Sequence, residues 1–251
     1  MSGYGARSGF ANEYEVVEML NSPEMALTSG GIRQALGISP SALISAEKVK
    51  GTPKPDVKVI INGESKTPVY LSLKKYEPEA DFNHLCRTSV GNYKSKLGFC
   101  DRVSEVLKLF TGELHPQECK SDILASRAPL SDRLGRRANL NEINEVERTE
   151  VLKFFKDNRD KVLNQVFCGD DPGMKPGYMV ITQVIDDDKK YYTIGMDEII
   201  EYYRSNYEVR ITARGSINLG AGLTAQRKGG SGSPSDLQFK FKPSVIVENL
   251  F

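Results

Sequence analysis

Residues 55–74 read PDVKVIINGESKTPVYLSLK, and this stretch decides the predicted fold. Residues 56–61 are rich in β-branched side chains, and Asn62-Gly63 is a turn signal. Residues 69–74 then alternate apolar and polar side chains, which is the pattern of a strand with two different faces. The stretch therefore predicts a β-hairpin.

The hairpin brings three polar side chains to one face. If the loop runs from Asn62 to Pro68, Ile61 pairs with Val69, and Asp56 then lies opposite Lys74. Because side chains alternate along a strand, Ser72 shares the face of Lys74. A carboxylate, a hydroxyl and an ammonium are expected to converge there.

This spacing resembles the P-D…(D/E)-x-K signature of metal-dependent nucleases. In such a site Asp56 and the next strand hold Mg²⁺, while Lys74 positions the attacking water and offsets charge. Ser72 stands where the signature has Asp or Glu, which removes one formal charge. Either Glu13 and the Leu73 main-chain carbonyl complete the site, or the protein binds DNA and cuts poorly.

A helix is predicted over residues 9–21, because Phe10, Val16, Val17 and Leu20 recur at helical spacing. Glu13 falls inside this apolar stripe, where an unpaired carboxylate would be costly. Two interpretations stay open: a core ion pair, or a metal or catalytic carboxylate.

The rest of the chain alternates predicted helices and strands. Helices are expected over 82–110, 141–167 and 196–205, and strands over 177–185 and 190–194. Strands and Gly-rich loops follow in the tail. A polar, Arg-rich connection over 120–140 is the best candidate boundary. It suggests a catalytic region, 1–135, and a DNA-recognition region, 136–251, which we expect to form one compact unit.

The charge distribution points to nucleic acid. The 251 residues carry a net charge of +1, but residues 204–242 hold seven basic and two acidic side chains. A basic tail on a mildly acidic body is typical of a nucleic-acid-binding face. Without an apolar run of about 18 residues or a signal-peptide start, we expect a cytoplasmic protein without membrane contact. Four dispersed cysteines and two histidines argue against zinc fingers.

Longer blocks resemble the small type II restriction endonucleases that cut GCGC. They occur in that family's order and cover nearly the whole chain, and the blocks at 214–218 and 226–230 are the most specific. The blocks besides the hairpin are Gly9–Glu13, Phe82–His84, Phe110–Leu114, Arg214–Asn218, Gln226–Gly230 and Leu237–Lys240.

The resemblance implies an α/β fold. It consists of a PD-(D/E)xK nuclease core, with a mixed central β-sheet flanked by helices, and a C-terminal β-rich DNA-recognition region. It also implies a type II restriction endonuclease that cuts double-stranded DNA at a short palindromic CG-containing site. GCGC is the leading candidate for that site. Mg²⁺ is the implied cofactor, with Mn²⁺ able to substitute. The enzyme would cut as a monomer, with a dimer on DNA as the alternative, beside a separately acting cytosine DNA methyltransferase.

The resemblance places Asp56, Ser72 and Lys74 on the catalytic positions and Glu13 on a helix carboxylate. The implied metal ligands are Asp56, Ser72 and the Leu73 main-chain carbonyl. Close relatives have Gln where Ser72 stands, so a neutral residue is tolerated in this branch.

The DNA contacts divide into base readers and phosphate contacts. Arginines suit bidentate contacts to guanine, and amides also read base edges, whereas hydroxyls and lysines suit phosphates. His84 falls where relatives place a base-contacting Gln, but an interior histidine is the alternative. The other predicted DNA-binding residues are Lys75, Arg214, Gly215, Ser216, Asn218, Gln226, Arg227 and Lys228.

Two other functions stay open. A degenerate site would make the protein a catalytically weak or inactive sequence-specific DNA-binding protein. A structure-specific repair or nicking nuclease is the other alternative, which the base-reading Arg, Asn and Gln side chains disfavour.

Overall fold

The computed structural model describes residues 3–22, 24–25, 29–39, 42–51, 54–61, 67–120, 122–125, 137–186, 188–228 and 235–251. The chain divides into two compact units. The first comprises Met1–Asn83, Phe167–Tyr202 and Pro243–Phe251, and the second His84–Val166 and Tyr203–Lys242. The functional division proposed near residue 135 remains a prediction, and residues 126–136 of its connection lie outside the described residues.

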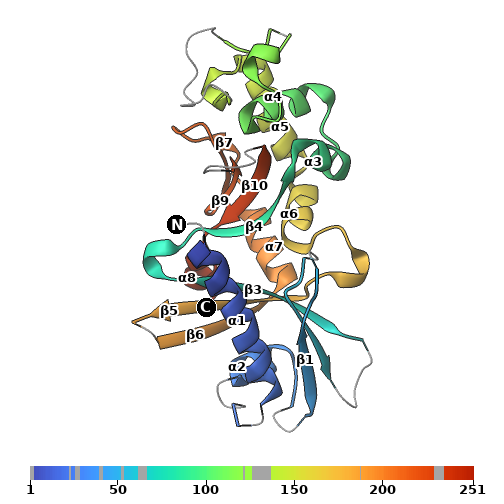
Figure 1. Ribbon diagram of the computed structural model, residues 1–251, viewed down its shortest axis with the longest axis vertical. Coiled ribbons are helices and arrows are strands. Elements are labelled where there is room, and N and C mark those ends of the chain that lie inside the picture. Colours follow the sequence, from blue (N-terminus) through green and yellow to red (C-terminus); the bar gives the residue numbers. More distant parts are fainter. Residues whose placement is uncertain are drawn as a thin grey trace. The chain divides into compact units, whose positions relative to one another are not determined.

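The first unit contains a five-stranded mixed sheet with the order β1-β2-β3-β5-β6 (Figure 1). The β3 and β5 strands pair in parallel, and the other neighbours pair antiparallel. This sheet matches the predicted mixed central sheet. Its strands are β1 (Ile44–Lys48), β2 (Val57–Ile61), β3 (Val69–Tyr76), β5 (Tyr178–Ile185) and β6 (Asp188–Gly195).

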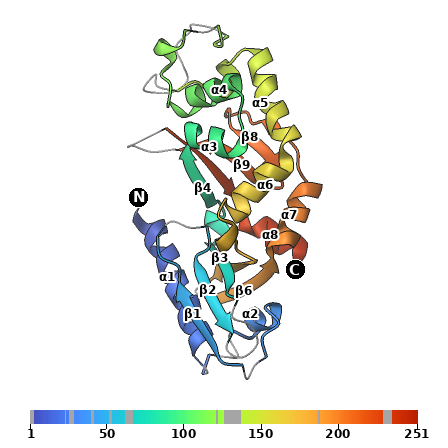
Figure 2. The same ribbon diagram turned by 90° about the vertical axis from the view of Figure 1, so that its right-hand side faces the viewer.

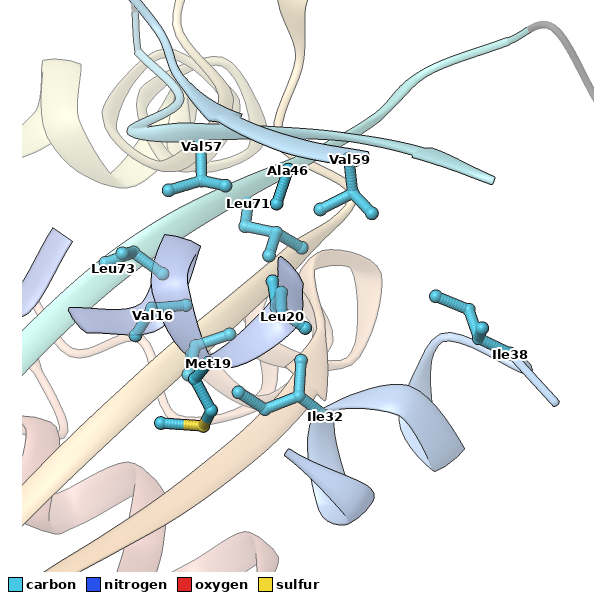
Figure 3. Packing of buried hydrophobic residues seen from close by; sticks show 11 residues of the cluster. Val16, Met19, Leu20, Ile32, Ile38, Ala46, Val57, Val59, Leu71 and Leu73 are labelled. Atoms are coloured by element: carbon cyan, nitrogen blue, oxygen red, sulfur yellow. The ribbon is translucent and has the colours of Figure 1, made fainter. Parts of the chain in front are cut away.

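Helix α1 (Gly3–Asn21) covers one face of this sheet, and the short α2 (Gly30–Ala35) contacts β6. Figure 3 shows Val16 and Leu20 of α1 facing Leu71 and Leu73 of β3, all within one buried cluster. Burying such aliphatic side chains stabilises the fold by about 1.5–3 kcal/mol each, which is ample to dock the helix. The odd-numbered side chains of β3 therefore face α1.

The even-numbered side chains of β3 face the other way, toward α8 (Pro243–Leu250). Tyr76 is buried on this face, and burial together with the charges of Asp81 and Glu248 raises its pKa to about 12. The Asp81 carboxylate accepts hydrogen bonds from the backbone N–H and the hydroxyl of Ser244, so it caps α8. Helices thus flank both faces of the sheet.

The second unit contains a five-stranded sheet with the order β4-β10-β9-β8-β7. Phe239 of β10 meets Tyr93 and Phe155 edge-on, which shows that helices cover the apolar face of this sheet. Its strands are β4 (Asn83–Ser89), β7 (Arg210–Ile211), β8 (Ile217–Gly220), β9 (Leu223–Arg227) and β10 (Asp236–Phe241). The remaining helices are α3 (Val90–Leu97), α4 (Asp101–Thr111), α5 (Glu145–Asp157), α6 (Arg159–Cys168) and α7 (Met196–Ser205), shown in Figures 1 and 2.

Several predicted elements are confirmed, including α1, the β2–β3 hairpin, β5, β6 and α7. Two predictions were wrong. Residues 83–89 form a strand rather than a helix, because they join the sheet beside β10. Residues 141–167 form two helices, because Asn158 leaves the helical conformation and its side chain bonds the Phe154 carbonyl. The turn Asn62-Gly63 lies outside the described residues.

The hairpin register also differs from the prediction. Val59, rather than Ile61, pairs with Val69, and Val57 pairs with Leu71. Ile61 instead pairs with Ile44 on β1. A slip of two residues keeps every side chain on its predicted face, because strand side chains alternate with a period of two. Asp56 therefore still meets Ser72 and Lys74.

Among the described residues, no helix combines the length and the apolar character that crossing a bilayer requires.

Candidate functional site

Asp56 is held immediately before β2 by backbone hydrogen bonds on both sides. Its N–H donates to the Leu71 carbonyl at 2.8 Å, and its carbonyl accepts from the Val49 N–H at 3.0 Å. The backbone at Asp56 is thus fixed to β3 on one side and to the end of β1 on the other. The aspartate is therefore held by the sheet rather than by a free loop.

The Asp56 carboxylate gathers three donors on one oxygen. Its Oδ2 accepts from the Leu73 N–H at 2.6 Å and from the Ser72 hydroxyl at 3.3 Å, and it lies 3.8 Å from the Lys74 ammonium. The side chain of Lys74 is 13% exposed and that of Asp56 is 25% exposed. Within the described residues, Oδ1 of Asp56 accepts no hydrogen bond, so this oxygen can take a ligand.

The Leu73 carbonyl is a second oxygen donor on the same edge. In an extended strand the N–H and C=O of one residue point to the same side, and the Leu73 N–H points at Asp56. Ser72 is fully buried, so its hydroxyl contacts Asp56 rather than open solvent. Carboxylate, carbonyl and hydroxyl oxygens are the donors that Mg²⁺ and similar hard cations take.

The described residues contain no cluster of three His, Cys, Asp or Glu side chains that could hold a metal ion. A cation at Asp56 would therefore depend on one carboxylate and one carbonyl. Mg²⁺ sites often use one or two carboxylates and leave the other positions to water and substrate phosphate. The residues around Asp56 fit such a site.

Glu13 is not brought together with this cluster. Its carboxylate forms an ion pair with Lys48 of β1 at 2.5 Å, and the Lys48 ammonium lies 4.3 Å from the centre of the Phe10 ring. Because α1 packs against the face of Leu71 and Leu73, Glu13 lies on the opposite face of β3 from Ser72 and Lys74. Of the two interpretations, the ion pair is the one that the structure shows.

Gly169 lies against the residues that lead into Asp56, a contact that sequence reasoning missed. It has φ +77°, and a Cβ added there would lie only 2.9 Å from the Cβ of Lys54. Lys54 is two residues before Asp56. A glycine just after the helix ending at Cys168 is a visible sequence signal for a helix end, but its partner is 115 positions earlier.

A polar face of the second sheet carries the predicted amide readers. Asn218 pairs with Thr224, and Gln226 pairs with Gln238, so these side chains lie on one face of three adjacent strands. Gln226 donates to the Thr224 hydroxyl at 2.9 Å, which orients its amide. The full row on this face is Arg210, Asn218, Thr224, Gln226, Gln238 and Lys240.

Arg214 is exposed in the turn between β7 and β8. This turn is closed by hydrogen bonds from the Gly215 N–H to the Thr212 carbonyl and from the Ser216 N–H to the Thr212 hydroxyl. Gly215 has φ +76°, a conformation that favours glycine. The turn thus presents Arg214 to solvent on a defined backbone.

Arg227 lies on the other face of its strand. Its guanidinium carbon is 5.8 Å from the centre of the Phe110 ring in α4, and alternation separates it from Gln226. The structure therefore does not place Arg227 in the row of amide readers. Lys228 follows, with its N–H bonded to the Asp236 carbonyl at 3.0 Å, while Gly229 and Gly230 lie outside the described residues.

His84 is exposed on β4, which excludes the interior alternative. Lys75 lies on the α1 side of β3, opposite to Lys74, and its charge helps to lower the pKa of Glu15. A DNA contact by either residue remains a prediction.

A mixed sheet that places Asp56 and Lys74 together at adjoining strands defines the fold class of the PD-(D/E)xK nucleases. Comparison with known proteins supports this class. The R.HinP1I restriction endonuclease family matches residues 56–247, so the chain belongs to that family. It is accordingly a type II site-specific deoxyribonuclease, which binds double-stranded DNA, and the family generally uses divalent metal ions.

A solved structure shares the fold. The restriction endonuclease MspI, crystallised in complex with its cognate DNA, is similar with a TM-score of 0.57 at 14% identity. The similarity covers 92% of this chain and 87% of that chain. No curated protein sequence matches the chain.

Proposed function

We propose that the protein is a Mg²⁺-dependent restriction endonuclease that cuts duplex DNA at a short palindromic site containing CG, with GCGC as the proposed sequence. Mn²⁺ is expected to substitute for Mg²⁺. The proposal includes cutting by a monomer in the cytoplasm, next to a separate cytosine DNA methyltransferase that protects the host sites.

The observation that carries the proposal is the contact of Asp56 Oδ2 with the Leu73 N–H and the Lys74 ammonium. Asp56 and the Leu73 carbonyl would hold the cation, with Ser72 as a buried support. When bound, a divalent ion polarises the scissile phosphate and lowers the pKa of a bound water. The Leu73 N–H orients the carboxylate, so one of its oxygens stays directed outward.

Lys74 is the residue that we expect to position the attacking water. Its mostly buried ammonium can donate a hydrogen bond to that water and offset charge on the phosphate. Attack in line forms a new phosphorus–oxygen bond while the bond to the 3′ oxygen breaks, leaving a 5′ phosphate and a 3′ hydroxyl. The Asp56 carboxylate keeps Lys74 in place before DNA arrives.

The proposed site sequence rests on the second unit. Arg214 has the fork geometry for guanine O6 and N7, and Asn218 and Gln226 offer amides for base edges. The ordered Gln226 amide, hydrogen-bonded to Thr224, fits a base reader better than a mobile side chain would.

The test is cleavage of an unmethylated plasmid of known sequence with purified protein and Mg²⁺. Bands whose sizes match the GCGC map support the proposal. A discrete pattern that fits another map would overturn the site sequence alone. A smear, or no cutting with Mg²⁺ or Mn²⁺, would overturn sequence-specific cleavage.

Matched lysine variants test the assigned chemistry. Lys74→Ala should abolish cleavage and retain duplex binding in a mobility-shift assay. Lys58→Ala removes a lysine from the same hairpin that pairs with the exposed Glu47, and it should cut normally. Loss of both cleavage and binding in Lys74→Ala would mean that the site is misassigned.

The second candidate is a catalytically weak or inactive, sequence-specific DNA-binding protein. It is favoured because, among the described residues, Asp56 is the one carboxylate in contact with Lys74. Calorimetric titration of Mg²⁺ into the protein–DNA complex separates the two, because a degenerate site should bind no metal.

A further inference from the structure

Residues 212–216 and residues 226–228, here called the two DNA-reading loops, lie at the same end of the second sheet. Ile217, at the start of β8, pairs with Ala225, near the end of β9. The turn that carries Arg214 therefore lies at the end of the sheet where β9 finishes at Arg227 and Lys228 follows. How these loops are spaced decides which base edges their side chains can reach at once.

Residues 137–141, here called the bridging segment, contact both loops. The Arg137 guanidinium donates to the Lys228 carbonyl at 2.7 Å, and the Asn141 amide donates to the Ala213 carbonyl at 3.4 Å. Between them, Asn139 packs against Gly215 so closely that a Cβ on Gly215 would lie 2.9 Å from the Cβ of Asn139. These contacts join two loops that are otherwise separate along the chain.

The bridging segment is itself anchored in the core of this unit. Its alternate residues, Ala138 and Leu140, are fully buried, and the Ala138 N–H donates to the Leu109 carbonyl of α4 at 3.0 Å. The Asn139 N–H donates to the Glu142 carboxylate at 2.6 Å, which closes the following turn. Apolar residues thus anchor the segment, while Arg137, Asn139 and Asn141 contact the loops.

We propose that the bridging segment sets the spacing of the two DNA-reading loops and that Arg137 is a positioning residue for sequence specificity. This rests on the proposed DNA-reading role of the loops. Arg137 acts through the Lys228 backbone rather than through a base. Its loss should therefore change the choice between sequences more than the affinity for DNA in general.

The test compares Arg137→Ala with Arg137→Lys, which keeps the charge and N–H donors but loses the planar guanidinium. Cleavage of the cognate duplex and of its single-base variants is measured at fixed salt. We expect the preference for the cognate site to fall by about tenfold in Arg137→Ala, the scale of one weakened base contact. Arg137→Lys should recover part of it. Lys153→Ala is the control, because it removes one positive charge at an exposed position on α5.

Hydrogen exchange of the free protein provides a second measurement, which needs no DNA. Arg137→Ala should speed exchange in residues 212–216 as well as 226–228, and Asn141→Asp, which removes a donor, should speed it in 212–216. If wild type shows no sequence preference, the proposed function fails, and this measurement still tests the bridge. Exchange that changes only near Lys228 would overturn the inference.

A uniform loss of affinity with an unchanged cleavage ratio would also overturn the inference. That result, with a shallower salt dependence, is expected if Arg137 contacts a phosphate. If Arg137→Ala does not fold, Arg137→Lys and Asn141→Asp decide the question by the same two measurements.

Discussion

The Leu73 N–H donates a 2.6 Å hydrogen bond to the Asp56 carboxylate, so the edge of β3 orients the acid that immediately precedes β2. The neighbouring strand thereby supplies a backbone donor, a side-chain hydroxyl and an ammonium to one oxygen. Among the described residues the second oxygen, Oδ1, accepts no hydrogen bond, and it is the oxygen that we propose binds the cation.

Asp56→Asn is expected to abolish cleavage while duplex binding remains. The amide oxygen can still accept from Leu73, but the negative charge that attracts the cation is gone. We expect at least a hundredfold loss of cleavage rate, beyond the roughly 10–100-fold typical of outer-shell partners of a metal. Plasmid cleavage is measured with Mg²⁺ and binding with Ca²⁺. Cleavage near the wild-type rate would refute the assigned metal ligand.

Ser72→Ala should retain cleavage within about tenfold, because Leu73 and Lys74 still hold Asp56. The lost neutral hydrogen bond should lower the free energy of unfolding by about 1 kcal/mol. Urea unfolding and single-turnover cleavage measure the two effects. A folded variant with hundredfold slower cleavage would instead make the hydroxyl an essential ligand.

Gly169→Ala is expected to slow cleavage because it displaces Lys54 and with it the residues that lead into Asp56. At φ +77° a side chain costs about 1–2 kcal/mol, and the new Cβ would press on Lys54. We expect kcat to fall with KM little changed, and the thermal midpoint to fall as well.

Two further variants separate displacement of Lys54 from the backbone strain of a positive φ. In the Gly169→Ala background, Lys54→Gly removes the opposing Cβ and should restore part of kcat but not of stability. Gly37→Ala is the control for strain, since Gly37 also has a positive φ, +67°, and nothing lies within 4 Å of an added Cβ there. Full activity in Gly169→Ala would contradict the positioning role.

Acid stability should depend on Glu15. Burial raises the pKa of Glu15, but hydrogen bonds from Lys189 and Tyr191 outweigh burial and lower it below 4.5. A lowered carboxyl pKa stabilises the fold above about pH 4.5, and this contribution is lost as the pH falls through the folded-state value. Urea unfolding midpoints between pH 6 and pH 3 should therefore fall less steeply in Glu15→Gln.

The exposed Glu24 supplies the control for this pH series. Glu24→Gln should follow the wild-type curve. Parallel curves for Glu15→Gln and wild type would show that the ion pair between α1 and β6 adds no stability that depends on Glu15.

Local sequence patterns were sufficient for the elements whose signal is periodic. The helical spacing in α1 and the alternation in β3 each lie within one segment, so they could be read directly. The same alternation placed Ser72 and Lys74 on one face, and it survived a register error of two residues. The strand at 83–89 was missed because its pairing partner, β10, lies about 150 positions later in the chain.

The sequence by itself determined the candidate residues. It indicated Asp56 and Lys74 of a hairpin for catalysis, and the amides and arginines of a basic tail for DNA binding. Only the tertiary structure decided their partners. In the structure Glu13 forms an ion pair with Lys48, and Arg227 lies beside the ring of Phe110. Gly169 lies against Lys54, and Arg137 donates a hydrogen bond to the Lys228 carbonyl. The physical reason is that strand and helix periods fix a face, whereas the contact made on that face depends on segments brought together by folding.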